Sequence, residues 1–411
     1  MSSSIDTNSV IALAERVGAR NYAPLPVVLT RAEGVWAWDV EGRRYLDCLS
    51  AYSSVNQGHR HPAIIAALIE QANRLTLTSR AFYNDRMGPF LQLLCDVCEM
   101  DVALPMNTGA EAVETAIKVA RKWGYEVKGI ARDCAEIIVC RNNFHGRTTT
   151  IVGFSSDPVA RDGFGPYTPG FEVIDFGDLE ALQAAITPNT VGFLVEPIQA
   201  EAGIILPPDG FLAGARQICE AHDVLFMLDE IQTGLGRTGR MFAHQHEDDA
   251  KPDVMMLGKA LGGGVYPVSA VVARREVMDV IRPGTHGSTF GGNPLAAAVG
   301  QRSLEVLLDE HLAERAARLG RDLIDRLQSS QLECVRAVRG RGLLVGIEIH
   351  RAMGPARRFC ERLLELGVLC KDTHEQVIRL APPLTLESEH IEWLVERLQT
   401  ALSTCDKTSG S

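Results

Sequence analysis

Lys259 is the lysine whose surroundings best suit chemistry at an amine. Of the seven lysines in the chain, it alone lies between an apolar run and a glycine run, in VMMLGKALGGGVYP (254–267). Removal from water disfavours the charged form of an amine and so lowers its pKa. The neutral amine is a nucleophile that forms Schiff bases with carbonyl compounds. A lysine that lays its apolar stem along a strand end and keeps its charge in water is the alternative that this feature leaves open.

Asp229 lies thirty residues before Lys259 and directly after the apolar run VLFML (224–228). At the carboxyl end of a parallel strand, it would lie where open α/β sheets bind their ligands. A carboxylate there can pair with the protonated ring nitrogen of pyridoxal phosphate, which makes the ring an electron sink. The alternative is a helix N-cap, but the glycine-rich GLGRTG (234–239) that follows is a poor helix start.

Two segments could hold a phosphate group. In NTGAEAVETA (107–116), small residues precede a helical pattern, so that free N–H groups and the helix dipole could bind an anion. HGSTFGGNP (286–294) offers hydroxyl groups in a glycine-rich loop. Neither segment is specific by itself.

A formal GxGxxG, at Gly234, Gly236 and Gly239, raises a nicotinamide-dependent dehydrogenase as a rival. A dinucleotide site needs this motif to leave a strand directly and to open a helix. Here EIQT intervenes after the apolar run, and RTGRMFAHQH is a poor helix start. The pair Gly258–Lys259 does not form a phosphate-binding loop either, because residue 253 is Asp and residue 260 is Ala.

A mostly parallel sheet is expected to position these residues. Four short apolar runs are typical of strands buried on both faces, at 136–140, 191–197, 224–230 and 254–259. Helical periodicity over 61–75 and 109–125 supplies crossovers between strands. From about residue 297 the pattern changes to a long helical stretch reaching residue 330, then RGRGLLVGIEI (339–349) and a final helix near 389–402.

This change predicts a large domain followed by a smaller one in an α/β chain, and an N-terminal segment is expected before them. Residues 1–50 form an N-terminal segment that packs with the small domain, 51–296 a large domain, and 297–411 a small α+β domain. A frayed tail is expected at KTSGS (407–411).

Composition excludes several function classes. The chain has 411 residues, 46% hydrophobic and 23% charged, with 41 basic against 52 acidic residues and a net charge of −11. That excess of acid argues against nucleic acid or an anionic membrane as a partner. The N-terminus has no secretory pattern, and the ten scattered cysteines suit a reduced compartment, so a cytoplasmic protein is expected. No metal site is expected, because Cys95 and Cys98 fit an amphipathic helix and the histidine pairs 59/61 and 244/246 have no nearby third ligand.

Together these segments resemble the class III, pyridoxal-phosphate-dependent aminotransferases of fold type I. The most specific stretch is VLFMLDEIQTGLGRTG (224–239), followed by LGKALGGGVYPVSAV (257–271). The resemblance implies a large domain with a mostly parallel central sheet flanked by helices, and a smaller α+β domain. It implies pyridoxal 5'-phosphate as cofactor, with Lys259 forming the internal aldimine and moving a proton, and Asp229 pairing with the pyridine nitrogen. A protein that keeps only the fold is disfavoured, because Lys259 and Asp229 are both present.

The resemblance also assigns the remaining cofactor contacts. Gln232 is expected to approach the phenolic oxygen and Phe144 to stack on the ring. Backbone groups of Gly109 and Ala110 are expected at the phosphate. Ser288 and Thr289 are expected to reach the phosphate of the neighbouring subunit, which implies a homodimer or a higher homo-oligomer with shared active sites.

Four segments resemble the ornithine branch of the family more than the acetylornithine or 4-aminobutyrate branches, which stay as alternatives: NYAPLPVVL (21–29), SAYSSVNQGHRHP (50–62), LTLTSRAFYND (75–85) and MNTGAEAVETAIKVARKWGY (106–125). The implied ping-pong reaction converts L-ornithine and 2-oxoglutarate to glutamate 5-semialdehyde, which cyclises to pyrroline-5-carboxylate, and L-glutamate. Ornithine breakdown and proline supply would both use this reaction.

Five substrate-binding residues follow from the same resemblance. Arg379 is the partner of the 2-oxoglutarate α-carboxylate, and Glu201 masks it while ornithine is bound, because an unpaired buried guanidinium is costly. Arg147 would bind the distant carboxylate, Tyr22 the α-amino and carboxylate end of ornithine, and Tyr52 would line the same pocket. For the arginines the alternative is a surface salt bridge, and for Tyr22 a packed loop aromatic. One departure is Ala200, where the family commonly has glycine.

Overall fold

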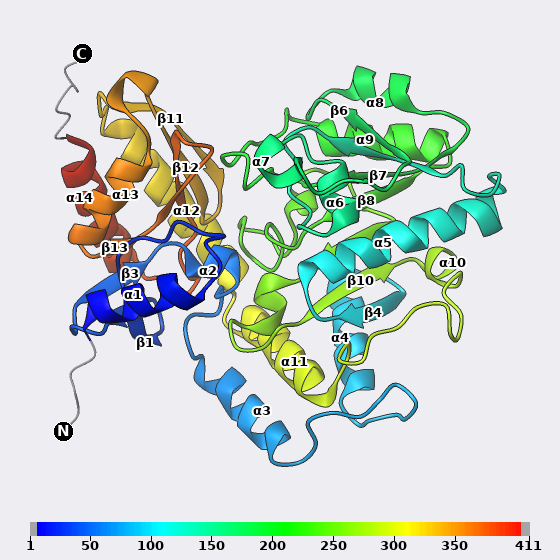
Figure 1. Ribbon diagram of the computed structural model, residues 1–411, viewed down its shortest axis with the longest axis horizontal. Helices are drawn as coiled ribbons and strands as arrows, with labels where there is room; N and C mark the ends of the chain where they lie inside the picture. Colours follow the sequence, from blue (N-terminus) through cyan, green and yellow to red (C-terminus); the bar gives the residue numbers. More distant parts are fainter. Residues whose placement is uncertain (1–5, 404–411) are drawn as a thin grey trace.

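The large sheet holds the four runs that the sequence predicts as buried strands. In the computed structural model, which describes residues 6–403, the chain forms this sheet and two smaller ones (Figure 1). The strand order is β4-β10-β9-β8-β7-β5-β6. The pairs among β5 to β9 are parallel, whereas β10 is antiparallel to β4 and β9. The strands are β4 Val102–Met106, β5 Glu136–Cys140, β6 Phe171–Ile174, β7 Thr190–Val195, β8 Leu225–Asp229, β9 Val254–Leu257 and β10 Ser269–Ala273.

Helices cover both faces of this sheet, which explains why its strands are apolar throughout. Along β5, Ile137 and Val139 join the core under α5 (Gly109–Trp123), while Ile138 and Cys140 join the core under α9 (Phe211–Ala221). Helix α8 (Leu179–Ala185) packs beside α9. The mostly parallel, doubly covered sheet of the predicted fold class is confirmed.

Local chemistry sets where the helices begin and end. Helix α3 (Pro62–Ala72) opens with proline at its first position, and α5 opens with a capping box between Thr108 and Glu111. The single helical stretch expected over 296–330 is wrong in one respect. It is split into α11 (Pro294–Asp309) and α12 (Leu312–Ser329), because His311 takes a left-handed conformation at φ 50° that ends the helical ladder.

The second part of the molecule is built on an antiparallel sheet of order β11-β12-β15-β14. Its strands are β11 Val335–Arg341, β12 Leu344–Ile349, β14 Lys371–Thr373 and β15 Val377–Leu380. The sheet packs with α12 and α13 (Arg357–Glu365), and α14 (Ser388–Ser403) packs on these two helices. A third sheet joins β1 Leu29–Glu33, β2 Trp36–Asp39 and β3 Arg44–Asp47 to β13 Val368–Leu369. The parallel pairing of β3 with β13 supports the packing of the N-terminal segment with the small domain, while the division at residues 50 and 296 stays a prediction.

One continuous core links the two parts, with Phe90 and Leu257 on one side and Ile378 and Leu394 on the other. The remaining helices are α1 Thr7–Val17, α2 Ser50–Ser53, α4 Met87–Cys98, α6 Thr149–Gly153, α7 Pro158–Arg161 and α10 Arg275–Met278. Cys95 and Cys98 lie on the amphipathic α4, as expected. Across residues 6–403, no helix has the length and apolar character to cross a membrane. The predicted frayed tail lies outside the described residues.

Candidate active site

A cavity of about 200 Å³ lies at the carboxyl ends of the parallel strands. The chain beyond β5, β7, β8 and β9 lines it, together with the start of α5. This edge is where open α/β sheets bind ligands, because the loops that leave adjacent strands meet there. The lining residues are Gly109, Ala110, Phe144, His145, Gly146, Glu196, Ile198, Asp229, Ile231, Gln232, Thr233 and Lys259.

Lys259 enters the cavity from a strained turn. It follows β9 through Gly258 and has a φ of 44°, in the left-handed region that non-glycine residues seldom adopt. Burial lowers the pKa of its amine, while the nearby Glu201 and Asp229 partly oppose that shift. The turn therefore presents an amine that loses its proton more easily than an exposed lysine.

Asp229 ends β8 and is held by a histidine that the sequence analysis missed. His145 Nδ1 lies 2.7 Å from Asp229 Oδ2, and the N–H of Ile231 donates to Oδ1 at 3.1 Å. The His145 side chain is buried, and its Nε2 has no hydrogen-bond partner within the described chain. His145 thus orients the carboxylate toward the cavity. Its only sequence signal is its position beside Phe144 in NNFHGRT.

Glu196 is a second residue that the sequence analysis missed. It follows β7 directly, and its Oε2 accepts the backbone N–H of Phe144 at 3.0 Å. Burial, reinforced by the charge of Asp229, raises the pKa of Glu196 well above its usual range. The shift favours the uncharged form of this carboxyl, which anchors the loop that presents Phe144.

The start of α5 offers an anion site. Gly109 and Ala110 lie in its first turn, where backbone N–H groups have no acceptor within the helix. A Cβ on Gly109 would come within 3.1 Å of Ile231, and Gly146, at φ +133°, packs closely on Ala110. The small residues keep this helix end open to the cavity, and the helix dipole favours a negative charge there.

Beside Lys259, Glu201 and Arg379 form an ion pair in which the arginine is buried and the glutamate is partly exposed. Arg379, in β15, is only 1% exposed, and its Nη1 donates to Glu201 Oε1, which also accepts from Gln232 Nε2 at 3.3 Å. Burial by itself would raise the pKa of Glu201, but Arg379 and Lys259 outweigh it and hold the pKa below the usual value. The Arg379 guanidinium lies 5.0 Å from the ring centroid of Tyr52. The structure therefore brings Tyr52, Glu201 and Arg379 together.

Other expected site residues lie at the margin or outside. Arg147 is exposed, with its guanidinium 5.5 Å from the Phe144 ring centroid, and Tyr22 is 67% exposed. Ser288 Oγ accepts from Asn107 Nδ2 at 3.0 Å, and Thr289 is exposed. Neither Ser288 nor Thr289 lines the cavity of its own chain. Their expected contact with a neighbouring subunit stays a prediction.

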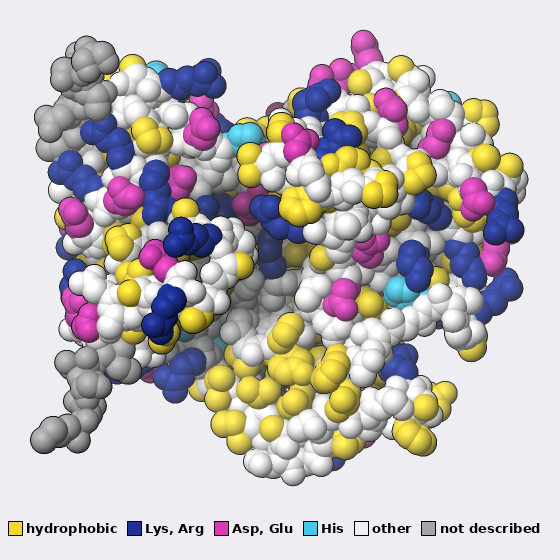
Figure 2. Space-filling model, viewed as in Figure 1, with side chains coloured by type: hydrophobic (Ala, Val, Ile, Leu, Met, Phe, Trp, Pro, Cys, Tyr) yellow, Lys and Arg dark blue, Asp and Glu magenta, His cyan; other side chains and the backbone are white. Residues whose placement is uncertain are grey.

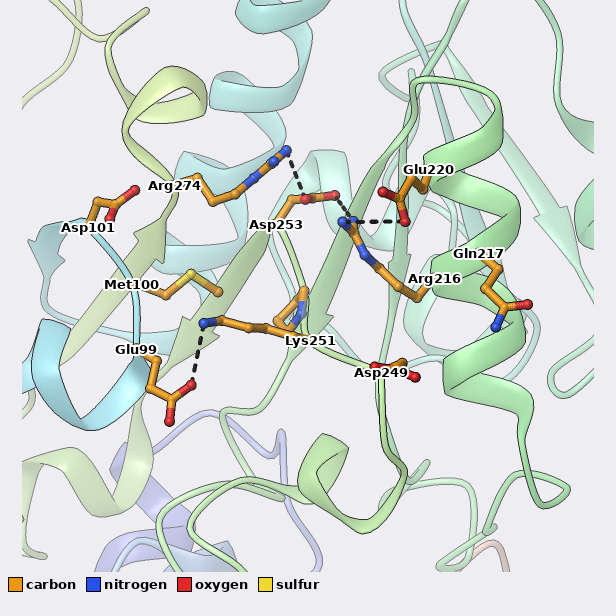
Figure 3. A pocket seen from close by; sticks show the side chains of 11 residues that line it. Glu99, Met100, Asp101, Arg216, Gln217, Glu220, Asp249, Lys251, Asp253 and Arg274 are labelled. Atoms are coloured by element: carbon orange, nitrogen blue, oxygen red, sulfur yellow. Dashed lines mark hydrogen bonds and ion pairs between the residues drawn. The ribbon is translucent and has the colours of Figure 1, made fainter.

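A larger cavity, of about 590 Å³, lies near the amino end of β9 (Figure 3). Its central group is the buried Asp253, between Arg216 at 2.8 Å and Arg274 at 2.9 Å. Lys251, the third cation lining it, pairs with Glu99 at 3.4 Å. Since acids already neutralise each of these cations, this cavity has no free positive group for an anionic substrate.

The histidine pairs are engaged in other contacts. His59 contacts Asp47 at 2.7 Å and His61 contacts Glu310 at 2.8 Å. His244 contacts Glu230 at 3.1 Å. These contacts give the three histidines structural roles within the fold.

Pyridoxal phosphate fits the groups in the 200 Å³ cavity. An amine, a carboxylate and a helix start are set at three sides, and Phe144 supplies an aromatic face. Gln232 Oε1 is buried without a hydrogen-bond partner in the described part of the chain, so it is free to serve a bound group. This fold and this donor set define a pyridoxal-phosphate-dependent aminotransferase.

The chain belongs to the class III aminotransferase family, whose model matches residues 17–402. It is 56% identical to the ornithine aminotransferase of Geobacillus sp. strain WCH70 over 393 residues, which cover 96% of this chain and 98% of that protein. The structure of ornithine aminotransferase from Toxoplasma gondii, which has PLP at its active site, superposes with a TM-score of 0.96 at 45% identity and covers 98% of this chain and 95% of that one. The structure of acetylornithine aminotransferase from Elizabethkingia anophelis superposes with a TM-score of 0.88 at 48% identity. The superposition covers 97% of this chain and 99% of that one.

Proposed function

We propose that the chain transfers the δ-amino group of L-ornithine to 2-oxoglutarate, giving L-glutamate 5-semialdehyde and L-glutamate. The observation that carries this proposal is the ion pair of Glu201 with Arg379 beside Lys259. The names of the relatives support the choice of ornithine.

The ion pair answers a demand of this substrate pair. The δ-carbon of ornithine carries no carboxylate, whereas the reacting carbon of glutamate does. Arg379 can bind that carboxylate through a bidentate fork, but an unpaired guanidinium at this burial would be costly. Glu201 neutralises Arg379 when ornithine is bound and moves aside for glutamate or 2-oxoglutarate.

Lys259 and Asp229 carry the chemistry in this proposal. Bound pyridoxal phosphate supplies an electron sink for the carbon that loses its proton. Lys259 Nζ holds and returns that proton, which its lowered pKa favours. Asp229, oriented by His145, maintains a negative charge for the ring nitrogen. Gln232 approaches the phenolic oxygen of the cofactor, and Phe144 stacks on one face of the cofactor ring.

The remaining residues fix the far end of the substrate. We assign Arg147 to the distant carboxylate, at the mouth of the cavity, and Tyr22 with Tyr52 to the α-amino and carboxylate end of ornithine. Ala200 fits its loop, because its side chain packs in a buried cluster with Ile198 and its φ is not positive.

The active unit in this proposal is a homodimer, or a higher oligomer, in the cytoplasm. We assign Thr289, with Ser288, to the phosphate of a second subunit, an assignment compatible with the absence of both residues from the lining of their own chain's cavity. Described cysteines such as Cys95, Cys134 and Cys140 are free thiols, which suits a reduced compartment.

Acetylornithine is the second candidate donor, because a 48% identical protein of known structure carries that activity in its name. Steady-state kcat/KM with 2-oxoglutarate separates the candidates. We expect L-ornithine to exceed N-acetylornithine and 4-aminobutyrate by at least about 100-fold. A preference for N-acetylornithine would move the chain to that branch and leave the cofactor site intact.

Glu201→Ala tests the masking role. Without Glu201, Arg379 faces the ornithine methylenes unpaired, so the ornithine half-reaction should slow by about tenfold or more, while the glutamate half-reaction holds or improves. Single-turnover rates with each donor measure the two effects. Equal losses in both half-reactions would contradict the switch.

A further inference from the structure

The loop that carries Glu201 is strained and short. It is closed by two hydrogen bonds between Gln199 and Ile205, each 3.0 Å, and it turns through Gly203 at φ +107° and Ile204 at φ +56°. A β-branched residue in the left-handed region is a genuine outlier. Such a conformation persists only where its surroundings determine it.

One side chain of the small sheet stabilises this loop conformation. Arg339, in β11, donates from Nε to the carbonyls of Gly203 and Ile204, both at 3.0 Å, and from Nη2 to Gly203 at 2.7 Å. Its Nη1 pairs with Glu348, which directs the fork toward the loop. The Arg339 side chain is 22% exposed, so these charge-assisted bonds are partly shielded from water.

Strand register explains why this loop fits here. Arg339 lies opposite Gly346 of β12, and Gly346 lies opposite Arg379 of β15. The two arginines therefore share one row and one face of the sheet, separated by a glycine. A Cβ on Gly346 would come within 3.1 Å of Ile204, so the glycine leaves the room that the loop fills.

The row holds both parts of the loop. Arg379 pairs with the Glu201 side chain, Arg339 grips the carbonyls two and three residues later, and Thr373 Oγ1 donates to the Glu201 carbonyl at 2.6 Å. With the backbone fixed at three points, only the Glu201 side chain is left to move. We infer that Arg339 is a positioning residue that sets Glu201 against Arg379, and thereby favours the ornithine half-reaction over the glutamate half-reaction.

This inference rests on the proposed function, and Arg339→Lys tests it. Lysine keeps the charge but cannot fork across two carbonyls. The ratio of single-turnover rates, ornithine over glutamate, should fall by about tenfold, as expected for loss of charged hydrogen bonds. The ratio is taken within one preparation and does not depend on the fraction of folded protein.

Arg336→Gln is the matched control. Arg336 pairs with the same Glu348, at 2.8 Å, but forms no hydrogen bond with the loop within the described chain and is 65% exposed. Its variant should leave the ratio within about twofold, because exposed ion pairs contribute little. In a Glu201→Ala background, Arg339→Lys should change the ratio by less than about twofold, because its effect passes through Glu201.

Amide hydrogen exchange of segment 199–205 in the protein without substrate gives a second readout. Exchange should accelerate in Arg339→Lys and not in Arg336→Gln. An unchanged ratio with unchanged exchange, or a change of ratio that persists without Glu201, would overturn the inference. If the wild-type protein does not react with ornithine, the proposed function is wrong. The hydrogen-exchange measurement would still test whether Arg339 stabilises segment 199–205.

Discussion

Glu196 and Glu201 line neighbouring parts of one site, yet the fold moves their pKa values in opposite directions. Burial beside Asp229 raises the pKa of Glu196, whereas Arg379 and Lys259 overcome burial and lower that of Glu201. These shifts favour the uncharged form of the acid that anchors the Phe144 loop and the charged form of the acid that masks Arg379. Residue type alone could not separate these roles, because each depends on partners distant in the chain.

Lys259→Ala should bind the cofactor and yet lose about 10²–10⁴-fold in either half-reaction, because no amine remains to move the proton. Single-turnover rates with L-ornithine and L-glutamate measure this loss. Lys251→Ala is the control, since Lys251 pairs with Glu99 in the cavity far from the site. Ordinary turnover by the Lys259 variant would remove that lysine from the mechanism.

At the scale of elements, the site depends on turns that carry strain. Residues 50–53 all have φ between 47° and 67°, so α2 is a left-handed turn, and it presents Tyr52 to Arg379. Asp47 holds its entry by accepting the N–H groups of Leu49 and Ser50 at 2.9 and 2.8 Å. Left-handed turns of this length are costly for residues with a Cβ.

Ala51→Gly should therefore stabilise the protein, by about 1 kcal/mol, because the exposed Ala51 has φ 47° and glycine adopts that conformation freely. Ala66→Gly is the control of opposite sign. Ala66 is exposed in the right-handed α3, where glycine costs about 1 kcal/mol. Urea unfolding of both variants measures the difference, and destabilisation by Ala51→Gly would show that the turn is not strained.

Glu230 organises the glycine-rich segment after β8. Its buried carboxylate accepts from Thr233 Oγ1 at 2.5 Å and from the N–H groups of Ala243 and His244 at 3.1 and 2.9 Å. Burial opposes the charge, but these donors and the His244 ring outweigh it and lower the pKa of Glu230.

A carboxyl with a lowered pKa contributes stability that is complete above its unfolded value of about 4.5 and is lost as pH falls through the folded value. Glu230→Gln should lower the free energy of unfolding by about 2 kcal/mol at neutral pH. The difference in unfolding free energy between variant and wild type should become smaller below about pH 4.5. Denaturant unfolding across this range measures it. As a control, Glu220→Gln, at an exposed residue, should have the same free energy of unfolding as wild type. A stability loss in Glu230→Gln that does not change with pH would contradict a charged Glu230 in the folded state.

Sequence patterns predicted the strands and the site residues that can be recognised from the residues next to them in the sequence. Buried apolar runs marked β5, β7, β8 and β9, and the ends of two runs marked Asp229 and Lys259. The patterns missed His145 and Glu196, which act on Asp229 and Phe144 from 84 and 52 residues away. They also missed the helix break at His311, because a left-handed residue leaves no periodicity signal.

At the scale of the whole molecule, one apolar surface stands apart. Figure 2 shows hydrophobic side chains gathered over α3 and the segment that follows it. Exposed members of this region include Ile69, Leu75, Leu77, Phe82 and the fully exposed Tyr83. Contiguous exposed apolar surface is typical of an interface between subunits, which supports the proposed homodimer.

Phe82→Asp with Tyr83→Asp should yield monomers, because charges in an apolar interface are costly. Light scattering measures the mass, and retention of bound cofactor measures the shared site. Val159→Asp, at an exposed residue of α7, is the control. An unaltered mass for the double variant would place the subunit contact elsewhere.

The most direct test of the central claim is the visible spectrum of the purified protein with its cofactor, before and after L-ornithine is added without any oxo-acid. We expect the cofactor's visible band to disappear and glutamate 5-semialdehyde to be trapped as a coloured adduct. N-acetylornithine should leave the band intact. A band that survives ornithine and bleaches with N-acetylornithine or 4-aminobutyrate would contradict the assignment of the donor. No visible band after addition of pyridoxal phosphate would contradict the role of Lys259 itself.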